Sequence, residues 1–256
     1  MLHFIDSPLF AAVYPLVLIG MVITGYLVAE YFYHRKNITW KGSGIENGII
    51  GLFALLISFT LLMSGNSQKE RTGIEHQLAD GVAQMKRTAD ILPPEAKDSV
   101  YTYLRHHLDL HIALFEKRIS KSADLVSELN RLNENFWQNF HHERDSMRFR
   151  QGMELLLPVY NQLNSSSYKL AYSYNERIPH LVILLIIISS WLIGILVGFM
   201  NGFYEKRHYL VPLIFVVIVS LMVQSIRDLD NPYGGTIRPQ YDNLKDIRSL
   251  ILEPES

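Results

Sequence analysis

The chain has 256 residues, of which 48% are apolar and 19% are charged, and its formal net charge is −1. A near-neutral charge without a basic arm argues against a nucleic-acid-binding protein. The chain contains no cysteine, which excludes disulfide scaffolds, thiolate zinc sites and cysteine nucleophiles. Its length allows one or two domains.

Four apolar stretches without a charged residue dominate the sequence, at residues 9–29, 47–64, 181–204 and 209–226. A hydrocarbon core about 30 Å thick needs roughly 17–25 helical residues, so each stretch is long enough to cross a bilayer. The stretches come in two pairs separated by short turns. The sequence therefore predicts an all-α integral membrane protein with four transmembrane helices in two hairpins.

The turns of both hairpins are basic, with Arg35, Lys36 and Lys41 in the first and Lys206 and Arg207 in the second. Positive loops near membrane helices are enriched on the cytoplasmic side. This bias, which is small here, places both termini and the long middle segment outside.

We expect four segments: a first hairpin at 1–65, an extramembrane helical domain at 66–178, a second hairpin at 179–230 and a tail at 231–256. The middle segment carries as many acidic as basic residues, and its apolar residues recur at helical spacing. Pro93 and Pro94 end one helix and begin the next, and Pro158 predicts another break. The second span is expected to continue into a helix over 67–92, and a helix over 165–178 into the third span.

Two groups of small residues recur at helical spacing in the spans. They are Ser190, Gly194, Gly198 and Gly202 in the third span, and Gly44, Gly48 and Gly51 at the start of the second. Small side chains let helix backbones approach closely in a membrane. We interpret both groups as helix-packing residues, either within the chain or between subunits.

Few residues suggest a charged or metal site. Glu30 and Glu46 lie about one turn from a membrane edge, where a carboxylate either serves an ion pathway or reaches water. His107 and His111 are four residues apart, so both rings could bind one metal, although solvated or interface histidines have the same spacing. Since no catalytic or cofactor-binding motif is present, we expect neither an enzyme nor a cofactor, and whether a metal binds stays open.

The fourth span ends in a short polar run, Asp228, Leu229, Asp230, Asn231, Pro232, Tyr233 and Gly234. The oxygen atoms of Asp and Asn side chains suit a hard cation such as calcium. The same residues also cap turns by bonding the nearby backbone, which proline and glycine help to bend. The spacing favours the turn, because no bidentate glutamate follows at loop distance.

Three passages resemble the bacterial bestrophin-like family of membrane proteins, a family of unknown function. They are residues 51–60 with the following Glu75, residues 91–94 with the later Tyr103, and the run at 228–234. Residues 231–234 also resemble the proline-aromatic-glycine turn of bestrophins. The resemblance implies a pentameric ion channel whose second membrane helix lines the pore with apolar side chains. It also implies a cytosolic helical domain, opposite to the charge bias, while Gly235–Arg238 replace the acidic run that helps to bind calcium.

If the second span lines a pore, one face of it offers an apolar gate formed by Ile49, Phe53, Ile57 and Thr60. We therefore expect a homo-oligomeric ion channel in the inner membrane of a bacterium, in contact with lipid and ions. The alternative is a membrane-anchored sensor or scaffold without a pore, whose helical domain binds a partner. A membrane enzyme is the third possibility.

Overall fold

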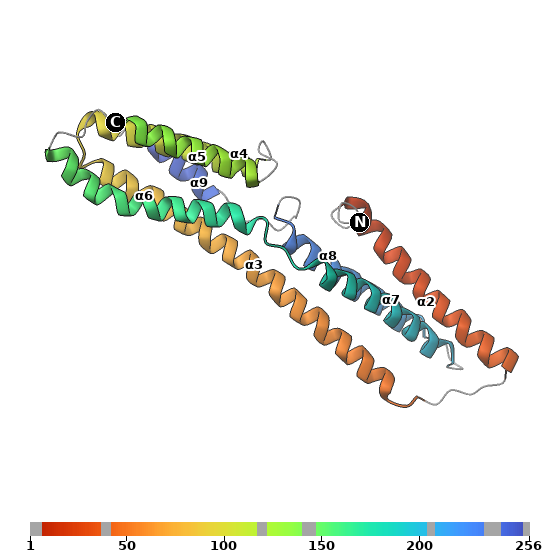
Figure 1. Ribbon diagram of the computed structural model, residues 1–256. Helices are drawn as coiled ribbons and strands as arrows, with labels where there is room; N and C mark the ends of the chain where they lie inside the picture. The colour runs from red at the N-terminus through yellow and green to blue at the C-terminus, as the bar shows by residue number, and fades with distance from the viewer. Residues whose placement is uncertain are drawn as a thin grey trace. The chain divides into compact units, whose positions relative to one another are not determined.

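The structure is a computed structural model that describes residues 7–36, 42–116, 122–139, 147–203, 208–232 and 242–252. Within these residues the regular elements are all helices, which confirms the all-α fold (Figure 1). The helices are α2 (Pro8–Lys36), α3 (Ile45–Ala89), α4 (Pro94–Phe115), α5 (Ser122–Asn139), α6 (Met147–Ser173), α7 (His180–Gly202), α8 (Leu210–Asp230) and α9 (Asp242–Leu252). Four of them, α2, α3, α7 and α8, are long and apolar enough to cross a membrane.

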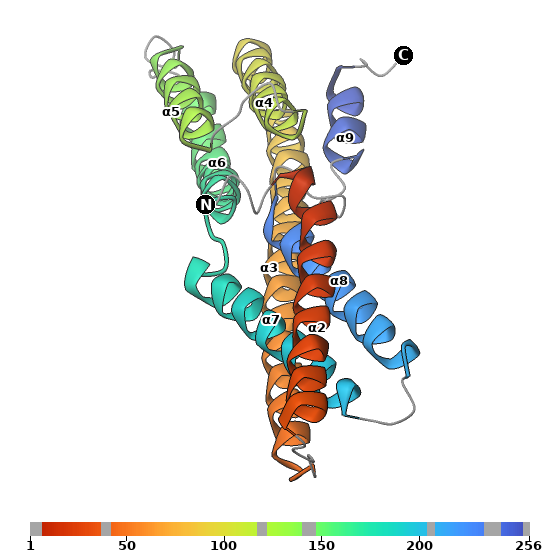
Figure 2. The ribbon, with the colours of Figure 1, turned by 90° about the vertical axis from the view of Figure 1, so that its right-hand side faces the viewer.

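The chain forms two compact units. Unit 1 contains Met1–Ser67 and Arg177–Ile237, and unit 2 contains Gln68–Glu176 and Arg238–Ser256. Helix α3 supplies the second membrane span of unit 1 and continues without a break into unit 2 (Figure 2). The expected continuation of the second span through residues 67–92 is thus confirmed as far as Ala89.

The start and end of α3 follow from its sequence. At its start the Glu46 carboxylate accepts hydrogen bonds from the backbone N–H of Ser43 at 3.2 Å and from the Ser43 hydroxyl at 3.1 Å. Gly44 between them has φ +84°, a backbone conformation that favours glycine. The helix ends at Ala89, shortly before the two prolines that cannot continue it.

Unit 1 is held together by the packing of α2 along α7, with α8 against both. Its apolar core contains buried side chains from all four membrane helices, including Leu18, Ile57, Ile186 and Val223. Tyr14 donates a buried hydrogen bond of 2.7 Å to the hydroxyl of Ser190, which fixes the level of α2 against α7.

Unit 2 is a helical bundle of α4, α5, α6 and the second half of α3, with the short α9 against α4. Pro94 begins α4, as its missing N–H allows at a first helical turn. The expected apolar stripes of α4 and α5 lie in the core, for example at Leu104, Leu108 and Leu129. In the sequence the apolar stripe that includes Leu129 extends to Phe140, which lies outside the described residues.

Two sequence-based expectations about α6 are wrong. Helix α6 runs through Pro158, because the burial of Leu156, Tyr160 and Leu163 on its inner face outweighs the hydrogen bond that proline cannot make. The helix also does not continue into the third span, since it ends at Ser173 and α7 begins at His180. Pro179 accounts for the break, because a proline disfavours helical geometry in the residue before it.

Candidate functional site

The membrane half of α3 has one face against its own chain and one open face. Of the four residues expected to line a pore, only Ile49 is exposed, at 44%. Phe53, Ile57 and Thr60 are at most 6% exposed and belong to the inner face. The apolar spacing that suggested a pore lining therefore belongs to a face that packs inside unit 1. A pore lining and a packed face have the same spacing, because each places its side chains on one side of the helix.

The open face of α3 combines small and bulky residues. Leu55 and Phe59 are 52% and 58% exposed. Gly48 and Gly51 are exposed too, and a Cβ atom added to either would meet no atom within 4 Å. These two glycines therefore do not serve helix packing within the described chain, and neither does Gly44, where the added Cβ also meets open space.

The small residues of α7 lie against α2. A Cβ atom added to Gly198 would stand 1.9 Å from the carbonyl oxygen of Val22, and one added to Gly202 would stand 2.6 Å from the Cβ of Ala29. Gly194 faces Leu18 with more room, at 3.2 Å. Ser190 completes this row through its bond with Tyr14. The backbones of α2 and α7 can approach so closely only because these positions lack bulk.

Gly25 of α2 is an equally tight position that the sequence spacing did not single out. A Cβ atom there would stand 1.9 Å from the carbonyl oxygen of Ile195. The sequence signal for Gly25 is weak, because the nearest glycine of the same span, Gly20, is five residues away and not at helical spacing. An added Cβ atom at Gly20 meets no atom of the described residues within 4 Å.

The polar run after α8 holds the chain where it enters α7. The Asp230 carboxylate accepts a buried hydrogen bond of 2.7 Å from the backbone N–H of Ile178. Asn231 accepts one of 3.2 Å from the guanidinium of Arg177, and Pro232 beside it is buried. Asp228 is half-buried near the end of α8, while Tyr233 and Gly234 lie outside the described residues. This geometry is that of a turn whose side chains serve the backbone.

The two candidate acidic groups near the membrane edges differ in their surroundings. Glu46 is only 5% exposed, and its carboxylate accepts hydrogen bonds from the backbone N–H and the hydroxyl of Ser43 at the start of α3. Glu30 is half-buried near the end of α2. A carboxylate with such partners is less available to an ion than a free one, because the donors of Ser43 occupy its lone pairs.

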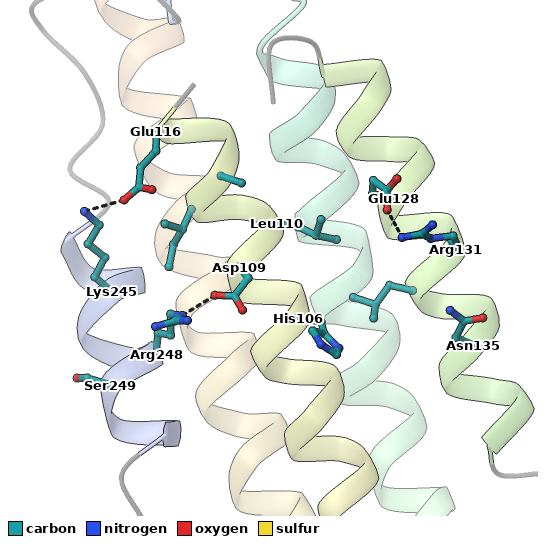
Figure 3. A pocket seen from close by; sticks show the side chains of 13 residues that line it. His106, Asp109, Leu110, Glu116, Glu128, Arg131, Asn135, Lys245, Arg248 and Ser249 are labelled. Carbon is teal, nitrogen blue, oxygen red and sulfur yellow. Dashed lines mark hydrogen bonds and ion pairs between the residues drawn. The ribbon is translucent and has the colours of Figure 1, made fainter. Parts of the chain in front are cut away.

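Unit 2 contains a groove of about 930 Å³ between α4, α5 and α9 (Figure 3). Its walls carry three ion pairs, Asp109–Arg248, Glu116–Lys245 and Glu128–Arg131. Leu110, Ala113 and Leu132 line it between the charges. A second hollow of about 360 Å³ shares His106, Leu132 and Asn135 with it and extends towards the start of α4.

The histidines of α4 divide between the groove and the core. His106 lines the groove, while His107 and His111 are fully buried on the other side of the helix. No cluster of three or more His, Asp or Glu side chains that could hold a metal ion occurs among the residues that the structure describes. His107 and His111 lie side by side, with ring centroids 4.9 Å apart. The described residues offer no third His, Asp or Glu side chain that would complete a metal site with them.

Comparison with known proteins identifies the family. A family model described as a bestrophin-like domain matches residues 47–244. Two crystal structures of a bacterial bestrophin homologue from Klebsiella pneumoniae share the fold, each with a TM-score of 0.71. The variant with a tryptophan-to-alanine substitution is 15% identical, covering 94% of this chain and 95% of that one. The variant with a tyrosine-to-alanine substitution is 16% identical, covering 96% and 98%.

No curated protein matches the chain. The family model nevertheless covers well over half of the sequence, including the membrane half of α3, the bundle helices and the turn after α8. The resemblance noted in the sequence is thereby confirmed, and the chain belongs to the bestrophin-like family.

Proposed function

We propose that the protein is one subunit of a homo-oligomeric ion channel in the cytoplasmic membrane of a bacterium. Copies of α3 surround a central passage, and the open face of α3 lines it. Membership of the bestrophin-like family supports conduction, and the bacterial homologue with the same fold supports the bacterial origin. A pentamer is the subunit number that the family resemblance favours, and closed cyclic symmetry brings the same helix of each subunit to the axis.

The observation that carries this proposal is the composition of the open face of α3. The open face of α8 consists of bulky aliphatic residues, for example Leu213, Val217 and Leu221, as suits a helix against lipid. The open face of α3 contains bulky residues too, such as Leu52 and Leu62, but also Gly48 and Gly51, where an added Cβ would meet no atom of the described residues within 4 Å. Small residues at an unoccupied face favour contact with another protein helix, because van der Waals packing drives association inside a membrane.

The gate is assigned to Gly51, Leu55 and Phe59, which follow one another at four-residue spacing on the open face. Rings of leucine and phenylalanine from several subunits form a constriction that can close by losing its water. This assignment moves the gate around the helix from the stripe of Phe53 and Ile57, whose side chains are buried in their own chain.

Purified protein in planar bilayers tests the proposal. We expect Phe59→Ala and Leu55→Ala to raise the conductance or the open probability, because a smaller side chain widens and wets the constriction. Val217→Ala on α8 is the matched control, since it shortens an equally exposed apolar side chain on another helix. Wild-type bilayers without current, or equal effects of Leu55→Ala and Val217→Ala, would overturn the proposal.

The groove of unit 2 favours a second candidate function, a membrane-anchored sensor or scaffold. A hollow of about 930 Å³ with apolar and charged walls is of the size that binds ligands or peptide segments. This function gains support if bilayers with the wild-type protein stay silent while a ligand protects His106 and Arg131 in the groove from chemical modification.

A further inference from the structure

Two histidines occupy core positions of the bundle in unit 2. His107 and His111 continue the inner stripe of α4 together with Leu104 and Leu108, and all four side chains have 0% exposure. Histidine is rarely buried completely unless its polar atoms have partners. The hydrogen bonds of the two rings therefore need a full account.

The partners of His107 define its protonation state. Its Nε2 lies 2.8 Å from the hydroxyl of Ser167 on α6, and that hydroxyl also lies 2.8 Å from the carbonyl oxygen of Leu163. A hydroxyl has one proton, and the carbonyl can only accept it. Ser167 therefore donates to Leu163 and accepts from His107, which assigns the imidazole proton to Nε2. Nδ1 is left as a bare acceptor, without a partner among the described residues.

His111 is in a less favourable position. Neither of its ring nitrogens has a hydrogen-bond partner in the part of the chain that the structure describes. A neutral imidazole always carries one N–H, so at least one buried donor is unpaired here, at a cost in stability. Protonation of either ring would add another donor without an acceptor and place a charge beside the second ring, 4.9 Å away.

The surroundings favour the neutral rings. Burial lowers the pKa of His111 to about 4. Burial and the neighbouring His111 hold the pKa of His107 well below its usual range. Tyr103, whose ring centroid is 5.6 Å from that of His107, stays neutral because burial raises its pKa well above the ordinary value.

Other titratable groups belong to the same bundle. Arg71 and Glu75 of α3 are buried in the same bundle, and the Arg71 guanidinium donates to the carbonyl oxygens of Ser173 and Glu176 at the end of α6. The titratable residues buried on α6 and just after it are Tyr160 and Tyr174. The charged side chains of α5 and α9 whose burial the structure describes are not buried; they are Asp124, Glu128, Arg131, Glu134, Lys245, Asp246 and Arg248. Glu75 is therefore the rival acid-sensitive group.

We infer that His107 and His111 form an acid sensor, in which protonation releases α4 from the core of the bundle. In the open state the rings reach water and titrate near their usual value of about 6.5. The closed state binds protons less readily than the open state. The free energy that favours the closed state is therefore full above about pH 6.5 and falls as the pH drops towards about 4. The inference concerns unit 2 and does not depend on conduction.

Hydrogen exchange of the full-length protein in detergent, corrected for the intrinsic pH dependence of exchange, tests the sensor. In wild type, the opening equilibrium of α4 should rise by up to about 100-fold per pH unit below pH 6, because two protons are taken up. His111→Leu removes one proton and the unpaired donor, so the slope should fall to about ten-fold per unit. His106→Asn, on the exposed side of the same helix, is the matched control and should keep the wild-type slope.

Two results would overturn the inference. The first is an unchanged slope in His111→Leu together with a lost slope in Glu75→Gln, which would make the carboxylate the sensor. The second needs no variant: ¹⁵N chemical shifts of labelled histidine should show both buried rings neutral at pH 6 in the closed protein. A protonated ring at that pH would contradict the geometry.

Discussion

Gly198 and Gly48 illustrate how a single residue type can have opposite surroundings in one protein. Both belong to rows of small residues in membrane spans, and their spacing supports the same interpretation for the two rows. In the structure Gly198 touches the backbone of α2, whereas the position of Gly48 is open. Spacing predicts that a helix can be approached closely, but only the structure identifies the partner, because the packed and the open sides of these membrane helices are both largely apolar.

Substitution of Gly198 should force α2 and α7 apart. In Gly198→Leu the new side chain begins 1.9 Å from the carbonyl oxygen of Val22, so the backbones must move. We expect a loss of about 1–3 kcal/mol in unfolding free energy, or failure to fold. Unfolding in mixed micelles measures it, and Gly20→Leu, at an open position of α2, is the control. Equal losses in the two variants would contradict the close approach.

Asp230 shows how a charged residue that suggested a cation site can serve the backbone instead. Its carboxylate accepts a hydrogen bond from the backbone N–H of Ile178, just before Pro179. Ile178 lies between α6 and α7, so its N–H has no carbonyl of a helical turn to bond. The sequence left calcium binding and a turn both open, because carboxylates suit either. Asp230 takes the role of a turn residue because its hydrogen-bond partner, Ile178, lies 52 residues away in the chain. Local spacing does not reveal such a partner.

At the scale of whole helices, the sequence predicts best where local chemistry and packing agree. Helix α3 has strong signals at both ends and no proline between them, so its continuity could be foreseen. Pro158 is a local breaker that the packing of α6 overrides. Helix α9 was not expected, since its 11 residues are too few to be stable alone and depend on contacts with α4.

The docking of α9 should depend weakly on charge. Arg248 pairs with Asp109 and Lys245 with Glu116, but these side chains are 27–46% exposed. Exposed pairs of this kind contribute about 0.5 kcal/mol each. We expect Arg248→Asp to raise hydrogen exchange in α9 about two-fold or more, and Asp109→Arg in the same chain to restore it. Arg131→Asp, which breaks a pair within α5, is the control and should leave α9 unchanged.

An unrestored double variant would show that α9 is held by apolar contacts alone. Leu244, which is fully buried, would then carry the docking. Salt distinguishes ion pairs from apolar contacts without substitutions. If the ion pairs hold α9, its hydrogen exchange should rise at about 1 M salt, because exposed pairs weaken as the Debye length falls to about 3 Å.

For the whole molecule, the proposed assembly depends on which face of α3 meets the neighbouring copy. The side of a membrane helix that meets lipid and the side that meets other subunits are both apolar, so the sequence does not distinguish them, and its stripe of Phe53 and Ile57 selected the packed face. The distinction appears only when the chain's own contacts are known. What remains open on α3 is a face of Gly48, Gly51, Leu55 and Phe59.

The absence of cysteine from the chain makes this assembly directly testable by cross-linking. Each subunit of Leu55→Cys carries one thiol, so neighbouring copies of α3 around an axis should join in pairs through a short thiol-specific linker. We expect covalent dimers from Leu55→Cys in native membranes and few from Val217→Cys, which places the thiol on the lipid-like face of α8. A ring with an odd number of subunits leaves one unpaired, so the yield should stop short of completion. Dimers from Val217→Cys but none from Leu55→Cys would place α8 between the subunits and remove α3 from the axis.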